Sequence, residues 1–256
     1  MKMYKNIESK FKNCFIRMYN SWQDITINLK KYKSVRYYDD FIGLGRKCDT
    51  AYIIKYLCYN NLKSYQSNFF NYSYINLTSL PESLENIDSV FSGKLNANYS
   101  GAGKLYGFTC ELTGHRIHST MSYNKNDEGN NVDILEEKAK QEFLSKINYL
   151  REKFKISLAS KKRKLILINI YLDDNILNDI NNYIIKLHKS LNKVTKNFDL
   201  LVIIEDKYKE KEIKKIENVF VKYVTHFPQT HETINFNKMD LNGLHSIFSE
   251  FRSRKK

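Results

Sequence analysis

Two short apolar runs constrain this chain more than any other feature of its sequence. The first lies within KKRKLILINIYLDD (161–174), between a basic lead-in and two acids, and the second is FDLLVIIED (198–206). The segment between them has helical spacing over 175–195. A strand that is apolar on both faces is typical of a parallel or central position in a sheet. Such strands in alternation with helices predict an α/β fold, with α+β as the alternative. We expect three layers, with a small central sheet flanked by helices.

The rest of the chain predicts elements that surround this pair of strands. We expect a short strand and a glycine turn over 37–45, and a β-pair near 105–120. Apolar residues make up 42% of the 256 residues, which is enough for the core of one large domain. Helical spacing recurs at 1–34, 48–61, 80–93, 132–160 and 241–251, and the segment 207–224 predicts a helix with a strand as a further possible element.

Positive charge is concentrated near the N-terminus. The net charge is +14, and residues 1–38 carry nine Lys or Arg against two acidic residues. We therefore expect a basic helical extension at 1–36 and a single domain at 37–256. The asymmetry favours an anionic membrane surface as a partner of the extension, or else a solvated basic face. Lysines and tyrosines interleave in KKYKSVRYY, but no nucleic-acid-binding motif accompanies them, so no nucleic acid is expected. The oligomeric state is not predicted.

Cysteine usage and the lack of long apolar runs indicate the compartment. The cysteines Cys14, Cys48, Cys58 and Cys110 show no CxxC spacing, so no metal site is expected. No run has the length of a signal peptide core or of a membrane-spanning helix. We expect a cytoplasmic protein with free thiols, which its basic N-terminus could hold at the inner face of the membrane.

Cys48 stands where a glycine turn meets the start of a predicted helix, in FIGLGRKCDTAYIIKYL (41–57). The free N–H groups and the dipole of a helix N-terminus stabilise a thiolate. Arg46 and Lys47 add positive charge, and Gly45 permits a tight turn and a close approach of substrate. Cys48 is therefore a candidate nucleophile, with a small buried core residue as the alternative.

A thiol nucleophile needs a base and a group that orients the base. The segment GHRIHST supplies His115 and His118, and we favour His115 because a glycine precedes it. Asn169 lies within the first apolar run and Asp173 follows it, so either could orient an imidazole or simply cap a neighbouring element. A further arrangement places the base at His245 in NGLHS.

Residues 41–72 resemble the opening of a bacterial family of papain-like cysteine peptidases. Its members begin with a strand, a Ser-Leu-Gly-x-x-Cys turn, an Ala-containing helix and a Ser-x-Phe-Asp-Trp segment. Here the turn reads GLGRKC up to Cys48, and the aromatic segment contains Phe70-Asn71-Tyr72. The resemblance extends over roughly 38–205 and implies a papain-like arrangement. It also implies a catalytic Cys48. We expect Gly45, Arg46, Lys47 and Asn71, in the glycine turn and the aromatic segment, to contact the substrate.

Three functions are compatible with these residues. The first is acyl hydrolysis by a papain-like thiol enzyme, which needs no cofactor. The second is acyl transfer to a surface polysaccharide or sugar nucleotide. The resemblance implies this function, because genes of the family look like neighbours of surface-polysaccharide genes and a related papain-like fold serves as a sugar acyltransferase. Coenzyme A would then be the donor, with its phosphates held by Arg46, Lys47 and KKRK (161–164). The third is a non-catalytic basic module that binds an anionic glycan or a membrane surface.

Overall fold

The computed structural model describes nine stretches of the chain, and all of them belong to one structural unit, Val35–Lys256. The expected basic extension at 1–36 lies outside the described residues, except for its last two. The described stretches are 35–45, 48–60, 68–70, 73–99, 104–118, 132–170, 174–209, 213–225 and 241–253.

A four-stranded parallel sheet forms the centre of the unit, with the strand order β2-β7-β8-β9. Every residue of β7 and β8 is buried, and these strands are the two apolar runs of the sequence. Their predicted central, parallel position is confirmed, and so is the α/β fold. The strands are β2 (Asp40–Gly43), β7 (Lys164–Ile170), β8 (Phe198–Glu205) and β9 (Val219–Val224).

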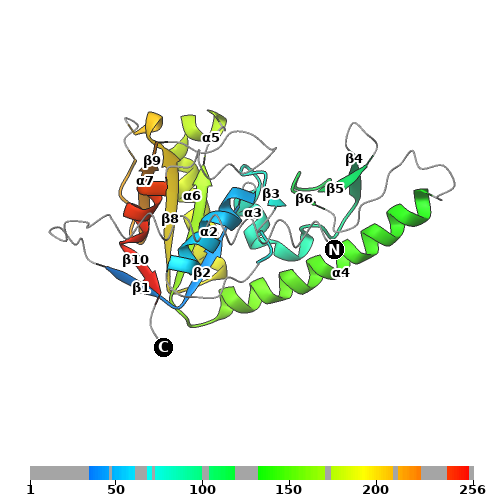
Figure 1. Cartoon of the computed structure of the whole chain (residues 1–256), viewed down its shortest axis with the longest axis horizontal. Coiled ribbons are helices and arrows are strands. Elements are labelled where there is room, and N and C mark those ends of the chain that lie inside the picture. The colour runs from blue at the N-terminus through cyan, green and yellow to red at the C-terminus, as the bar shows by residue number, and fades with distance from the viewer. Residues whose placement is uncertain are drawn as a thin grey trace, which may run out of the picture. The chain divides into compact units, whose positions relative to one another are not determined.

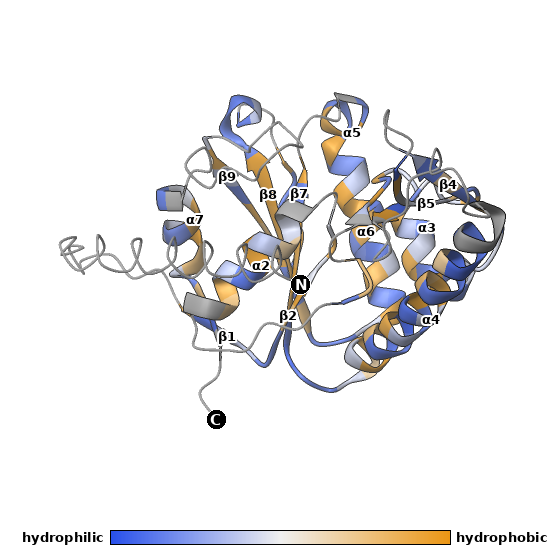
Figure 2. Cartoon of the chain, turned by 45° about the vertical axis from the view of Figure 1, so that its right-hand side comes forward, coloured by the Kyte–Doolittle hydropathy of each residue, from blue (hydrophilic) through white to orange (hydrophobic). Residues whose placement is uncertain are grey.

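Helices cover both faces of this sheet, so the expected three layers are present. Side chains such as Ile166 and Val202 join a core cluster with Leu187 of α6 and Phe154 of α4. Neighbouring residues of each strand point to the opposite face, where α2 and α7 lie (Figure 2). The helices are α2 (Cys48–Asn60), α3 (Leu80–Glu85), α4 (Val132–Ala159), α5 (Asp174–Asn178), α6 (Ile180–Val194) and α7 (Leu241–Phe248).

A second, antiparallel sheet is inserted between α2 and α4, with the order β3-β6-β5-β4. The predicted β-pair near 105–120 is β5 with β6. One face packs on α4, where the ring centroids of Phe108 and Phe143 are 5.0 Å apart (Figure 1). The strands are β3 (Ser73–Tyr74), β4 (Leu95–Tyr99), β5 (Leu105–Cys110) and β6 (Arg116–His118).

Two three-residue strands join the ends of the unit. β1 (Arg36–Tyr38) pairs in parallel with β10 (Phe251–Ser253), in a sheet of their own. Only Asp39 separates β1 from β2, and its N–H donates to the carbonyl of Arg163 at 2.8 Å. The strand predicted over 37–45 is therefore divided between two sheets.

Three predicted helices differ from the observed ones. The helix expected over 175–195 is interrupted at Asp179, and the one over 80–93 ends at Glu85 before a 3₁₀ turn, η1 (Ile87–Ser89). Within 207–224 the expected helix is wrong for the described residues, which form a 3₁₀ turn, η2 (Asp206–Tyr208), and an irregular stretch, whereas the strand expected there is β9. In that stretch the N–H of Lys214 donates to the side chain of Asn181 at 2.8 Å. None of the described helices is long and apolar enough to cross a bilayer.

Candidate functional site

The junction between β2 and α2 places a helix N-terminus at one edge of the parallel sheet. The N–H of Leu44 donates to the carbonyl of Leu167 at 2.8 Å, so the chain stays in register with β7 for one residue beyond the strand. Helix α2 begins at Cys48, as the sequence predicts. Because β2 runs parallel to its neighbours, this N-terminus lies at the carboxyl edge, where open α/β sheets bind their ligands.

Asn169 of β7 brings a polar side chain to the same edge. Gly43 is in register with Leu167, so Asn169 lies one step further toward the turn. Its side chain is completely buried, and its Oδ1 accepts a hydrogen bond from the hydroxyl of Thr50, the third residue of α2. The amide is therefore held against the first turn of the helix that Cys48 begins.

The amide nitrogen of Asn169 has no acceptor among the described residues. A buried donor without a partner costs free energy, and such groups are rare in native structures. The first turn of α2 also carries N–H groups that have no intrahelical partner. The site therefore combines several donors in one place, and an oxygen atom of a ligand would satisfy them.

Thr50 is a site residue that the sequence analysis missed. The available signal was a small polar side chain in the first turn of a predicted helix, next to the apolar Ala51 and Ile53. All three residues are buried against the sheet. A hydroxyl in such a place needs a partner, and that partner is Asn169.

A buried carboxylate ends the neighbouring strand at the same edge. Ile203 of β8 is in register with Asn169, so Glu205, two residues further on, points to the same face of the sheet. Glu205 is buried, and its carboxylate lies 2.7 Å from the ammonium of Lys207. The carboxyl edge thus presents a neutral amide on β7 and a neutralised carboxylate on β8.

His115 lies in the antiparallel sheet, and both of its ring nitrogens have partners there. Nδ1 accepts a hydrogen bond from the N–H of Asn76 at 3.1 Å, so Nε2 carries the proton. Nε2 lies 2.9 Å from Oγ of Ser83, and that hydroxyl donates in turn to the carbonyl of Ser79 at 2.7 Å. The imidazole joins the turn before β6 to α3.

This geometry is that of a structural histidine. The ring of His115 is completely enclosed, and burial lowers its pKa to about 4, so it is neutral at pH 7. Gly114 adopts a φ of +68°, and a Cβ there would lie 3.3 Å from the side-chain nitrogen of Asn76. The close approach that we expected of this glycine is therefore made to Asn76. To accept a proton from a thiol, His115 would have to give up its bond from Asn76.

Among the described imidazoles, only that of His245 belongs to a helix on the α2 face of the sheet. The ring of Phe248, on the same helix α7, has its centroid 6.3 Å from that of Tyr56 on α2. Burial is the main cause that lowers the pKa of His245, and the charge of Arg252 adds to it. The ring is therefore neutral at pH 7.

The other predicted site residues are only partly described. The backbone of Gly45 is buried at the end of the β2 turn. The hypotheses about the remaining side chains stay predictions, because these side chains lie outside the described part of the structure. They are those of Arg46, Lys47, Cys48, Asn71, His118 and Asp173.

The basic run at 161–164 lies at the opposite, amino edge of the sheet, roughly 16 Å along β7 from Asn169. Arg163 pairs with the buried Asp199 at 3.0 Å. Lys164 is completely buried and its ammonium donates to three carbonyls. These two cations are therefore engaged within the fold, and the expectation that the run holds donor phosphates is corrected for them. The acceptor carbonyls belong to Ser160, Lys162 and Lys196, at 2.7, 3.0 and 3.2 Å.

Within the described residues, no group of three or more His, Cys, Asp or Glu side chains is placed to hold a metal ion. The candidate site is therefore defined by the N-terminus of α2, the amide of Asn169 and the hydroxyl of Thr50. No family model, curated protein or solved structure matches this chain.

Proposed function

We propose that this chain is a thiol-dependent acyl hydrolase in which Cys48 is the nucleophile. The observation that carries the proposal is the buried amide of Asn169. Thr50 holds it against the first turn of α2, and its nitrogen has no acceptor among the described residues. A cysteine at a helix N-terminus has a lowered thiol pKa and reacts as the thiolate. The resemblance to papain-like cysteine peptidases assigns the same role to Cys48.

The proposed reaction uses the donors of the site as an oxyanion hole. The thiolate of Cys48 adds to the carbonyl carbon of an acyl group, a C–S bond forms, and negative charge moves to the carbonyl oxygen. That oxygen accepts hydrogen bonds from the amide of Asn169 and from N–H groups of the first turn of α2. Collapse breaks the bond to the alcohol or amine, which leaves with the proton that the base took from the Cys48 thiol. Water then cleaves the thioester and releases the carboxylic acid and the thiol.

The base is to be sought first in His118 and His245. The nitrogens of His115 are both engaged, by Asn76 and Ser83, so we assign that residue to the fold. His245 is on α7, on the same sheet face as α2, and its ring is neutral at pH 7. A base that pairs with Cys48 would lower its apparent pKa below the free value of about 8.5.

An activated ester tests the nucleophile without knowledge of the natural substrate. The full chain is mixed with 4-nitrophenyl butyrate, quenched in acid, and mapped by peptide mass spectrometry. We expect the butyryl group on the peptide that contains Cys48, and its loss in Cys48→Ser. Cys58→Ser is the matched control, because Cys58 is buried on the same helix and should not react. Acylation of another residue, with Cys48 unmodified, would contradict the proposal.

Variants at Asn169 and Thr50 test the oxyanion hole separately. We expect Asn169→Ala to slow acylation by about 10²–10³-fold, the usual effect of removing one such donor. Thr50→Val should slow it less, because the amide stays but loses its support, and Thr50→Ser should retain the rate. Iodoacetamide alkylation needs no oxyanion hole, so its rate should be similar in all of these variants. Equal losses in both assays would show that Asn169 supports only the local structure.

The pH dependence of Cys48 alkylation identifies the base. We expect an upward shift of the apparent pKa in either His118→Ala or His245→Ala, and none in His115→Ala. If His115→Ala alone shifts it, the structural assignment of His115 is wrong. If no variant shifts it, the helix N-terminus alone activates the thiol and the dyad is wrong.

A further inference from the structure

The antiparallel sheet has one face that α4 does not cover. Alternate residues of a strand point to opposite faces, and residues in register on neighbouring strands point to the same face. Tyr74 is in register with Arg116, Arg116 with Thr109, and Thr109 with Asn96. These four side chains therefore form a single row across all four strands, on the face opposite Phe108.

Contacts between neighbouring side chains of this face fix their conformations. The guanidinium of Arg116 lies over the ring of Tyr74, 5.7 Å from the centroid. The side-chain nitrogen of Asn98, one step along β4 on the same face, lies 2.7 Å from the hydroxyl of Thr109. Arg116 and Asn96 are exposed, and the other three side chains are half-buried. The face is thus a preformed surface that is accessible to a ligand.

The charge of this face is small and positive. The next pair along β4 and β5 is Lys94 with Glu111, whose charged groups are 3.0 Å apart and cancel. Beyond the register shift near the end of β4, Leu105 packs in the core, so the exposed Lys104 beside it points to the open face. Arg116 and Lys104 therefore carry the net charge among the described side chains of the face. The remaining groups are amides, a hydroxyl and a phenol, which can each donate and accept hydrogen bonds.

We propose that the sheet platform, defined as Tyr74, Asn96, Asn98, Thr109 and Arg116, binds an extended acidic oligosaccharide. The flat ring of Tyr74 suits the C–H face of a sugar ring, and Asn96 and Thr109 suit its hydroxyls. Arg116 can bind a uronic carboxylate with two parallel hydrogen bonds. Three inter-strand steps make the row roughly 14 Å long, the length of an oligosaccharide and not of one sugar. This proposal is independent of the chemistry at Cys48.

Other ligand classes fit the platform less well. A single-stranded nucleic acid needs several cations along its phosphates and two or three aromatic rings for its bases. The five described platform residues offer one cation and one ring, and Lys104 adds one further cation beside them. A hydrophobic peptide would need apolar side chains, and the row has none beyond the tyrosine ring. Uncharged hydrogen-bonding groups with these two cations match a polyhydroxylated chain that carries spaced carboxylates.

Calorimetric titration of the full chain with two tetrasaccharides tests the proposal. The probes are tetragalacturonate and a hyaluronan tetrasaccharide, and the matched neutral probe is a galactose tetrasaccharide. We expect at least one uronate to bind, at least tenfold more tightly than the neutral sugar. Arg116→Gln should weaken uronate binding at least tenfold, and Tyr74→Leu should weaken it by a similar factor. Lys189→Gln removes one exposed positive charge on α6 and should change the affinity less than twofold.

Three results would overturn the proposal. The first is no binding of either uronate at millimolar concentration. The second is an equal loss in Lys189→Gln and Arg116→Gln, which would show only a general attraction to a basic protein. The third is displacement of the uronate by a lower concentration of oligouridylate, which would assign the platform to nucleic acid. Circular dichroism of each variant checks that the fold is retained.

Discussion

At the scale of single residues, His115 shows how a residue that is common in active sites can instead join two elements. Its nitrogens bridge Asn76 and Ser83, and its ring packs edge-on against Phe70, with centroids 6.1 Å apart. A charged imidazole could not keep its bond from Asn76, because both nitrogens would then be donors. The neutral form is thus part of the folded state, and stability becomes sensitive to mild acid.

The pH dependence of unfolding measures this effect. The folded-state pKa of His115 is about 4, below its ordinary value of 6.5, so between these values the unfolded chain binds one more proton. Stability should therefore be fully present above pH 6.5 and fall by about 1.4 kcal/mol per pH unit, or about 3 kcal/mol in all, as the pH drops to 4. His115→Gln should lack this component. Urea unfolding of both proteins at pH 7, 6, 5 and 4 checks it; parallel curves would disprove it.

Lys164 is a second buried residue whose role can be measured. Its ammonium donates to three carbonyls around the end of α4, although burial lowers its pKa. Lys164→Met fills the space but leaves three acceptors without their charged donor, so we expect a loss of about 2–4 kcal/mol of unfolding free energy. Lys162→Met, at an exposed position of the same basic run, should cost less than about 0.5 kcal/mol. If Lys164→Met costs as little unfolding free energy as Lys162→Met, water replaces the ammonium as the donor to these carbonyls.

The residues that could be predicted are those whose chemistry conflicts with their neighbours in sequence. Asn169 interrupts an apolar strand, so the sequence alone marked it, and the structure places it at the α2 terminus. No local feature of the sequence identifies the hydrogen-bond partner of His115. Ser83 lies 32 residues away, on a short helix, and nothing in the local pattern connects the two. The identity of a side chain was readable, but its partner depends on tertiary packing.

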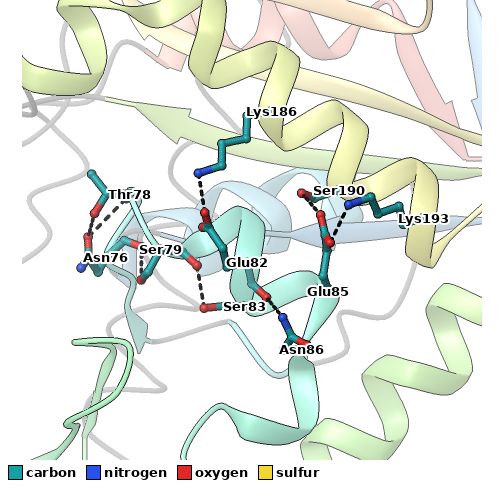
Figure 3. A network of polar contacts seen from close by, with 10 residues as sticks. All are labelled: Asn76, Thr78, Ser79, Glu82, Ser83, Glu85, Asn86, Lys186, Ser190 and Lys193. Atoms are coloured by element: carbon teal, nitrogen blue, oxygen red, sulfur yellow. Dashed lines mark hydrogen bonds and ion pairs between the residues drawn. The ribbon is translucent and has the colours of Figure 1, made fainter.

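At the scale of elements, α3 and α6 are joined by a polar network along their exposed border (Figure 3). Glu82 pairs with Lys186, and Glu85 binds both Ser190 at 2.6 Å and Lys193 at 2.7 Å. The lysine and glutamate of the first pair are both more than half exposed, whereas Ser190 is buried. The hydroxyl should therefore contribute more than the ion pair, because solvent screens exposed charges.

Two single substitutions separate these contributions. Ser190→Ala should lower the free energy of unfolding by about 1 kcal/mol, through loss of a partly buried hydrogen bond to a charged acceptor. Lys186→Gln should lower it by less than about 0.5 kcal/mol, and 1 M salt should reduce even that difference. Urea unfolding at pH 7 gives both values. A larger effect of Lys186→Gln would mean that the exposed pair fixes the packing of the two helices.

Helices and strands could be predicted where their burial requires a recognisable pattern of apolar residues within one segment. β7 and β8 are buried on both faces, and α4 carries a long amphipathic repeat, so their sequences alone were sufficient. β1 and β10 are three residues long and pair only with each other, and so short a segment has no readable period. The segment after β8 has helical spacing, but its backbone groups bind elsewhere, as Lys214 does. Tertiary partners decide such cases.

At the scale of the whole molecule, the boundary of the described unit is set by β1. The N–H of Arg36 donates to the carbonyl of Glu250 at 2.8 Å, and its guanidinium lies 4.3 Å from the ring centroid of Phe220. A chain that begins at Val35 retains these contacts. One that begins at Tyr37 loses both and shortens β1. Removal of the basic extension therefore preserves the contacts of Arg36 only if the shortened chain begins at or before Val35.

Removal of residues 1–34 tests the membrane hypothesis. We expect the shortened chain to unfold at the same urea concentration as the full chain, because every described contact is kept. It should lose sedimentation with phosphatidylglycerol vesicles at low salt, since most of the N-terminal cations are gone. For the full chain, binding should weaken at 0.1 M salt, where the screening length is about 10 Å. Equal sedimentation of the two chains would place the membrane contact elsewhere.

The pairing of β1 with β10 has a consequence for biosynthesis. β1 can pair only after β10 has been synthesised, because Arg36 is in register with Phe251, 215 residues later in the chain. At about 5–20 residues per second, the edge of β1 stays open for at least about ten seconds in every round of translation. During that interval the nascent chain exposes unpaired backbone groups to other chains. We therefore expect chaperones that shield the open strand, and faster translation, to raise the fraction of this protein that reaches its native state.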